Sequence, residues 1–273
     1  MFLKRTISAV VLVVIALATI LLGDLTLLFT LLAISLVAFS ELARAVGVHT
    51  QDKKMNALEI VGYISIIAYY GIIYFANTTT YIMLTIVLVM MAVMAVYVFT
   101  FPKFHANQVM ATYFSIIYAP VMFSFIYLTR TLEYGIYLVW MIFIGSWICD
   151  TCAYLVGMTI GKHKLAPVLS PKKSIEGAIG GIVGAATVGA LYGYLIVEQV
   201  IATQRITWVF ALIGAAGAVM SQVGDLAASA IKRNHDIKDY GKLIPGHGGI
   251  MDRFDSVIVT APMIYFLAVL LIK

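Results

Sequence analysis

The sequence predicts an all-α, polytopic integral membrane protein, and three observations carry this prediction. Of the 273 residues, 62% are hydrophobic and 11% are charged, whereas soluble domains carry about 25% charged residues. Nine stretches approach the roughly 20 apolar residues that a helix needs to cross a bilayer. The positive charges also gather on one side of these stretches, as they do in membrane proteins.

The nine predicted spans follow one another with few long interruptions. In order, they are 5–22, 25–46, 56–76, 80–101, 108–128, 134–160, 174–197, 206–230 and 254–272. The first follows Lys4 and Arg5 and has the charge pattern of a signal peptide. It has no convincing small-residue cleavage site and eight more spans follow it, so we expect it to remain as a helix.

The basic residues predict the orientation of the chain. With a cytoplasmic N-terminus, fifteen Lys and Arg residues fall on the cytoplasmic side, and only Arg130, Arg205 and Lys273 fall on the other. This bias predicts a protein of the inner (cytoplasmic) membrane whose C-terminus lies outside. The net charge of +5 is therefore interpreted as a topology signal, and no nucleic-acid partner is expected.

The two halves of the chain differ in character. Residues 1–133 form ordinary apolar spans, and we expect Glu41 and Glu59 to lie at membrane interfaces. This half could hold lipid, shape a groove or mediate assembly. Residues 134–273 carry polar residues within spans and two long cytoplasmic loops, 161–174 and 232–253, which predicts a catalytic region.

Small residues mark two of the later spans. Gly177, Gly180, Gly181 and Gly184 have small-xxx-small spacing, which suits close helix packing within the chain or across a homodimer. The sequence leaves both open. The Cys149-x-x-Cys152 pair lies inside one span without a second pair, so we interpret it as small packing residues.

Carboxylates within the spans predict a functional site. Asp150 and Asp225 lie about 16 Å and 10 Å from the cytoplasmic helix ends, each on a polar helix stripe that must face the protein interior or water. Asp252 and Asp255 share one face at the start of the last span. Carboxylate oxygens without His or Cys suit Mg²⁺. We predict Asp225 and Asp252 as its ligands, with Asp255 and Asp150 in outer positions or on a second cation.

The cytoplasmic loops supply matching positive charge. Ser170, Lys172, Lys173 and Ser174 directly precede a span, where helix N–H groups favour anions. Three glycines in the second loop, Gly246, Gly248 and Gly249, would let the backbone approach a ligand closely.

A longer pattern then resembles a known family. Ser229-x-x-Lys232-Arg233, Lys238-Asp239-x-Gly241 and Ile244-Pro245-x-His247-Gly248-Gly249-Ile250-x-Asp252-Arg253-x-Asp255 is similar to the signature of the phosphatidate cytidylyltransferases. The stretches Asp150-x-x-Ala153-Tyr154-x-x-Gly157 and Ser170-Pro171-Lys172-Lys173-Ser174-x-Glu176-Gly177 resemble the family too, with Ser174 where Thr is often found. The resemblance covers roughly residues 145–258.

The resemblance implies that CTP and phosphatidic acid are converted to CDP-diacylglycerol and pyrophosphate, with Mg²⁺, at a membrane site facing the cytoplasm. The catalytic residues expected are Asp225, Asp252, Asp255, Lys232, Arg233, His247 and Arg253. The substrate-binding residues expected are Ser170, Lys172, Lys173, Ser174, Ser229, Lys238, Asp239, Gly248, Gly249 and Asp150. A phosphate monoester is already mostly a dianion at neutral pH, so His247 is expected to position a phosphate or carboxylate rather than to act as a base.

Two other functions remain as alternatives. A cation-coupled or proton-coupled transporter could use Asp150 and Asp225, but it would leave the basic loops without a role. A CTP-dependent kinase for a polyprenol-type lipid would need a base for the hydroxyl and would release CDP. The product formed from CTP separates all three.

Overall fold

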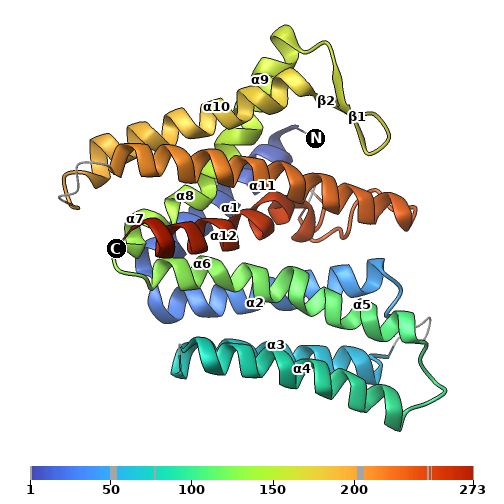
Figure 1. Cartoon of the computed structure of the whole chain (residues 1–273). Helices are drawn as coiled ribbons and strands as arrows, with labels where there is room; N and C mark the ends of the chain where they lie inside the picture. The colour runs from blue at the N-terminus through green and yellow to red at the C-terminus, as the bar shows by residue number, and fades with distance from the viewer. Residues whose placement is uncertain are drawn as a thin grey trace. The chain divides into compact units, whose positions relative to one another are not determined.

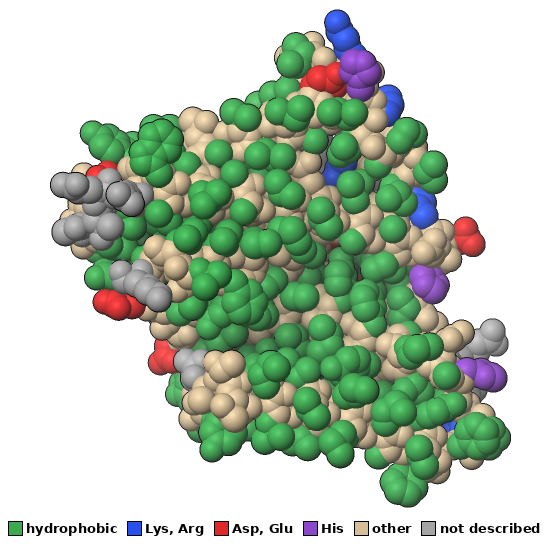
Figure 2. Space-filling model, in the orientation of Figure 1, with side chains coloured by type: hydrophobic (Ala, Val, Ile, Leu, Met, Phe, Trp, Pro, Cys, Tyr) green, Lys and Arg blue, Asp and Glu red, His purple; other side chains and the backbone are tan. Residues whose placement is uncertain are grey.

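The computed structural model describes residues 2–49, 54–76, 78–201, 206–244, 246 and 248–272. Within these residues, eight helical segments are long and apolar enough to cross a membrane. Helix α1 (Phe2–Leu22) adds a shorter apolar stretch, Val10–Leu22. The predicted all-α, polytopic membrane class is confirmed. Figure 2 shows the visible face of these helices covered mainly by hydrophobic side chains, as lipid contact requires.

The chain packs as two compact units, which are described separately. The first contains Met1–Ser124 and His235–Arg253, and the second contains Phe125–Asn234 and Phe254–Lys273. The division into 1–133 and 134–273, which was predicted from composition and concerns function, stays a prediction. The packing units have different bounds because a segment late in the sequence packs with the early helices.

The N-terminal part of the first unit is helical. Its elements are α1, α2 (Asp24–Ala45), α3 (Ala57–Phe75), α4 (Thr79–Phe99), α5 (Ala106–Ile116), the π-helical turn η1 (Ile117–Val121) and the start of α6 (Met122–Arg130). Helices α3 and α4 lie side by side (Figure 1). Phe39, Tyr69, Tyr70 and Phe123 are buried in its core.

Local sequence explains two features of this unit. Helix α3 begins with a capping box, in which the Asn56 side chain accepts from the Glu59 N–H and Glu59 accepts from the Asn56 N–H. The π-helical turn contains Pro120, which has no N–H for the helical ladder. The buried Tyr70 hydroxyl lies 3.3 Å from the Pro120 carbonyl and donates to it.

The second unit holds the remaining helices and a small hairpin. Its elements after α6 are α7 (Gly135–Leu138), α8 (Trp140–Phe143), η2 (Ile144–Ile148), α9 (Cys149–Ile160), β1 (Lys164–Ala166), β2 (Ser170–Ser174), α10 (Ile175–Tyr192), η3 (Gly193–Val197), α11 (Ile206–Asn234) and most of α12 (Met251–Leu271). Helix α10 packs against both α9 and α11, and the hairpin extends from the ends of α9 and α10 (Figure 1).

The glycines of α10 are used within the chain. A Cβ at Gly181 would lie 2.9 Å from the Cys149 carbonyl oxygen, and one at Gly177 would lie 2.7 Å from that of Ala153. Close packing of α9 on α10 therefore requires residues without a side chain at these positions. The homodimer stays a prediction.

Both predicted loops differ in detail from the structure. The 161–174 segment contains the antiparallel hairpin β1–β2, with Lys164 opposite Ser174. Helix α11 continues to Asn234, so Lys232 and Arg233 lie in its last turn, where positive charge complements the helix dipole. The connecting segment is therefore residues 235–250, which we call the signature loop.

Candidate active site

A pocket of about 470 Å³ lies among the elements of the second unit. We call it the helix pocket, and it is lined by Asp150, Ala153, Tyr154, Gly157 and Met158 of α9, Leu165 of β1, Lys172, Lys173 and Ser174 of β2, Gly177 and Ala178 of α10, and Gln222 and Asp225 of α11. The wall combines apolar side chains with two carboxylates and two ammonium groups. Five residues predicted for the site from the sequence thus line one cavity.

An ion pair joins two sides of the helix pocket. The Lys173 ammonium on β2 contacts the Asp225 carboxylate on α11, and the two side chains are only 26% and 28% exposed. Among the described residues, the Lys173 ammonium has no other hydrogen-bond partner. The Ser229 hydroxyl, one turn along α11, lies 3.5 Å from Asp225 Oδ1. The pair therefore ties the hairpin to α11 at the polar end of the pocket.

The start of α10 fixes the hairpin beside this pocket. Ser174 is the N-cap of α10, and its hydroxyl oxygen accepts from the Gly177 N–H at 3.1 Å. Glu176 accepts from the backbone N–H groups of Lys162 and His163 and contacts the His163 ring at 2.6 Å. These contacts fix both ends of the hairpin, whose second strand carries Lys172 and Lys173 at the pocket wall.

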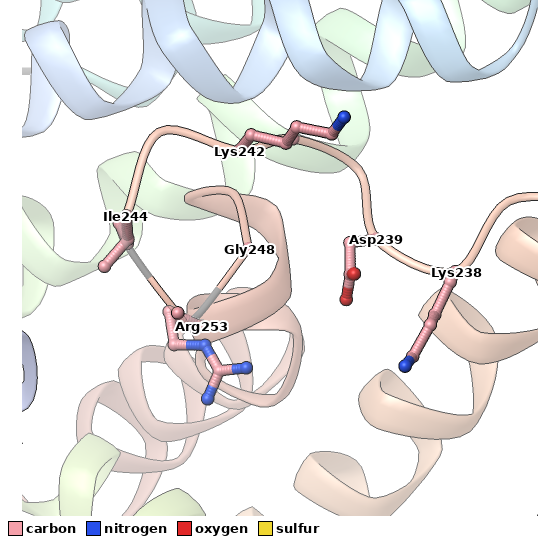
Figure 3. Close-up of a pocket in the computed structure, with 8 residues that line it drawn as sticks. Lys238, Asp239, Lys242, Ile244, Gly248 and Arg253 are labelled. Atoms are coloured by element: carbon pink, nitrogen blue, oxygen red, sulfur yellow. The ribbon is translucent and has the colours of Figure 1, made fainter. Parts of the chain in front are cut away.

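A second pocket, of about 480 Å³, lies at the signature loop in the first unit. We call it the loop pocket, and it is lined by Lys238, Asp239, Gly241, Lys242, Ile244, Gly246, Gly248 and Arg253. Lys238, Asp239 and Arg253 extend to one side of the loop and Lys242 extends to the other (Figure 3). Three cations against one carboxylate favour an anionic ligand.

Asp252 organises the loop around this pocket. Its side chain is buried, and Oδ2 accepts from the backbone N–H groups of Tyr240 and Gly249 at 2.8 and 3.0 Å. Gly248 has a φ of +88°, and a Cβ there would lie 2.8 Å from Asp252 Oδ2. Gly248 was predicted to let the backbone approach a ligand. The backbone conformation of the loop and its contact with Asp252 also require glycine at this position. The role of Asp252 as a metal ligand stays a prediction.

Glu41 also belongs to this arrangement, and sequence reasoning missed it. The Glu41 carboxylate, on helix α2, accepts from the backbone N–H groups of Ile250 and Met251, at 3.2 and 3.0 Å. Glu41 was expected at a membrane interface with no part in a site, whereas it is buried against the signature loop.

Comparisons with known proteins give the family. A model of the cytidylyltransferase family matches residues 3–271. The chain belongs to the cytidylyltransferase family. It is similar to proteins named phosphatidate cytidylyltransferase. The match with the one from Bacillus subtilis is 40% identical and covers 56% of each chain. Matches from Staphylococcus epidermidis and Staphylococcus aureus are 30% and 31% identical, each over 97% of this chain and 98% of the relative.

Several other predicted site residues line neither pocket. Lys232 and Arg233 lie at the end of α11, Ser170 begins β2, and the Asp255 carboxylate accepts from the Ser256 N–H at 2.9 Å. His247 lies outside the described residues. Asp225 and Asp252 belong to different units, so their predicted convergence on one ion stays a prediction.

The helix pocket of this family member has the donor chemistry of a magnesium site. No group of three or more His, Cys, Asp or Glu side chains suited to a metal occurs among the residues that the structure describes. Mg²⁺ commonly takes only one or two carboxylates and completes its shell with water and substrate phosphate. Asp225 at the pocket wall can supply one such carboxylate, and Asp150 lies on the same lining, where it suits an outer position.

Proposed function

We propose that this membrane enzyme transfers the cytidylyl group of CTP to phosphatidic acid, giving CDP-diacylglycerol and pyrophosphate. Membership of the cytidylyltransferase family and the names of the full-length relatives support this reaction. The observation that carries the substrate assignment is the helix pocket. Lys172 and Lys173 stand at one part of its wall, and Tyr154, Met158 and Leu165 supply apolar surface at another. This combination suits a phosphate attached to an acyl-bearing glycerol.

The reaction asks for little acid–base chemistry from the protein. The phosphate of phosphatidic acid, with a second pKa near 6, is mostly a dianion at neutral pH. One of its oxygens attacks the α-phosphorus of CTP, and the bond from that phosphorus to the bridging oxygen of pyrophosphate breaks. Catalysis then consists of aligning two polyanions and offsetting their repulsion.

Different basic side chains bind the phosphates of the two substrates. Lys172 and Lys173 bind the phosphate of phosphatidic acid in the helix pocket, and Lys238 and Arg253 bind the triphosphate in the loop pocket. The planar fork of Arg253 suits two phosphate oxygens at once. Lys173 has three N–H donors, so it can keep its contact with Asp225 and donate to a phosphate oxygen.

The residues also suit a magnesium ion, with Asp225 as a ligand. Asp252 is the second ligand proposed, and Asp150 and Asp255 take outer positions or a second cation. When bound, Mg²⁺ would neutralise charge on the triphosphate. The ion pair with Lys173 holds the Asp225 carboxylate at the wall of the helix pocket, which supports its assignment as a ligand.

The same proposal places the active site on the cytoplasmic face of the inner membrane. Its support is the positive charge of the 161–174 and 232–253 segments. CTP then enters from the cytoplasm, and the lipid enters from the bilayer.

Product identification tests the function directly. The purified protein is supplied in detergent with Mg²⁺, phosphatidic acid and CTP that is labelled at either the α-phosphate or the γ-phosphate. We expect α-label in the lipid product and γ-label in pyrophosphate. Transfer of γ-label to an added polyprenol, with release of CDP, would instead identify a lipid kinase. Unchanged CTP with cation flux in proteoliposomes would identify a transporter.

A further inference from the structure

Glu41 is a buried acidic residue in a helix to which the sequence assigns no chemistry. It lies on α2, its residue is 5% exposed, and its two carboxylate oxygens accept from different backbone groups. Oε1 accepts from the Ile250 N–H and Oε2 from the Met251 N–H. Met251 begins α12 and Ile250 directly precedes it, and N–H groups at the start of a helix have no partner within the helix. Glu41 therefore caps a helix whose start lies 210 residues later in the chain.

Two glycines of the signature loop wrap closely around this carboxylate. A Cβ at Gly249 would lie 2.5 Å from Glu41 Cδ, and one at Gly241 would lie 2.7 Å from the same atom. Neither separation leaves space for a side chain. Gly249, which was predicted to give a ligand access to the backbone, is thus required by a contact inside the protein.

Glu41 and Asp252 together hold both parts of the loop. They accept four backbone N–H groups, from Tyr240, Gly249, Ile250 and Met251. Because these four N–H groups donate to carboxylates of the protein, phosphate recognition in the loop pocket falls mainly to its cationic side chains. Lys238, Lys242 and Arg253 are all within three residues of a tied position.

We propose that Glu41 is a positioning residue for CTP, which holds the signature loop so that Lys238 and Arg253 meet the triphosphate. This inference rests on the proposed function. It assigns a specific task to the N-terminal helices, which the sequence left without one. A carboxylate is needed because each oxygen accepts a separate N–H. Glutamine has one acceptor only, and its NH₂ group would face a backbone N–H.

The matched comparison is Glu41→Gln against Glu59→Gln. Glu59 is also buried in the first unit and also caps a helix, accepting from the Asn56 N–H and contacting His49, but it lines neither pocket. For Glu41→Gln we expect the KM for CTP to rise roughly 10- to 100-fold, because one charge-assisted hydrogen bond is lost. The KM for phosphatidic acid should change far less. Glu59→Gln should lower thermal stability and leave both KM values unchanged.

A second measurement does not depend on catalysis. Hydrogen exchange in Glu41→Gln should accelerate at residues 249–251 and not at the start of α3. Glu59→Gln should show the reverse. Unchanged exchange at 249–251, or equal CTP effects in both variants, would overturn the positioning role. If the wild-type protein formed no CDP-diacylglycerol, the proposed function would fail, while the exchange result would still decide whether Glu41 holds the loop.

The glycine contact gives an independent check. Gly249→Ala should reduce turnover strongly in the wild-type background because the new Cβ meets the Glu41 carboxylate. In a Glu41→Ala background that space is vacated, so Gly249→Ala should add little further loss. A full additional loss in the double variant would refute the proposed contact.

Discussion

Separating Lys173 from Asp225 should destabilise the second unit and also reduce turnover. Asp225→Asn removes the charge that faces a Lys173 ammonium with no other hydrogen-bond partner among the described residues. A buried charge left without a partner costs several kcal/mol. These side chains keep about a quarter of their exposure, so we expect a loss of about 1–3 kcal/mol in the free energy of unfolding. At roughly 2–4 °C per kcal/mol, the resulting fall in Tm is large enough to measure.

The double variant Lys173→Met/Asp225→Asn gives the decisive comparison. Removing both charges removes the uncompensated ammonium, so the double variant should be more stable than the sum of the single losses predicts. Turnover should stay low in all three, since both groups are proposed to contact substrate or metal. Thermal unfolding is followed in detergent by tryptophan fluorescence, and cytidylyl transfer is assayed in parallel. Lys164→Met, an exposed change on the same hairpin, is the control. Additive stability losses would refute the ion pair as a structural contact.

Three further predictions concern the metal, the membrane and the helix packing. Asp225→Asn and Asp252→Asn should each shift magnesium dependence to higher concentration, because each removes the charge of a proposed ligand; normal dependence in Asp225→Asn would exclude this ligand. A reporter fused after Lys273 should be extracytoplasmic and one within 161–174 cytoplasmic, and finding both on one side would contradict the topology. Gly181→Leu should destabilise α9 against α10 by a few kcal/mol in thermal unfolding, owing to overpacking, whereas wild-type stability would exclude that close contact.

Composition and charge were sufficient to predict the membrane class and most of the helices. The lipid-facing surface must be apolar along a whole span, so this signal is local and continuous. The family inferred from the spaced residues is confirmed by the comparisons. Asp150, Asp225, Lys172 and Lys173 line one pocket, as ionisable residues that avoid lipid would do, while their roles in the reaction stay predictions.

Other features could not be found from local patterns. The contact of Glu41 with Ile250 and Met251 joins distant parts of the chain, and a single acidic residue near a span end has no periodic signal. The polar helix stripe of Asp150 was predicted from α-helical spacing, but the turn before Asp150, η2, is π-helical and has a wider ladder. This turn contains Ser146. The Ser146 hydroxyl is buried and donates to the Ile142 carbonyl. The strands of the hairpin are too short for a β-pattern to stand out.

The cap on α12 also imposes an order on biosynthesis. Helix α2 leaves the ribosome long before residues 250 and 251, which are 209 and 210 positions after Glu41. At about 5–20 residues per second, roughly 10–40 seconds pass before its backbone partners exist. During that interval the nascent chain carries a carboxylate whose final partners are missing, and the early helices can complete their packing only when the last span arrives. A chain that ends before residue 250 therefore lacks part of its first unit as well as its last helix.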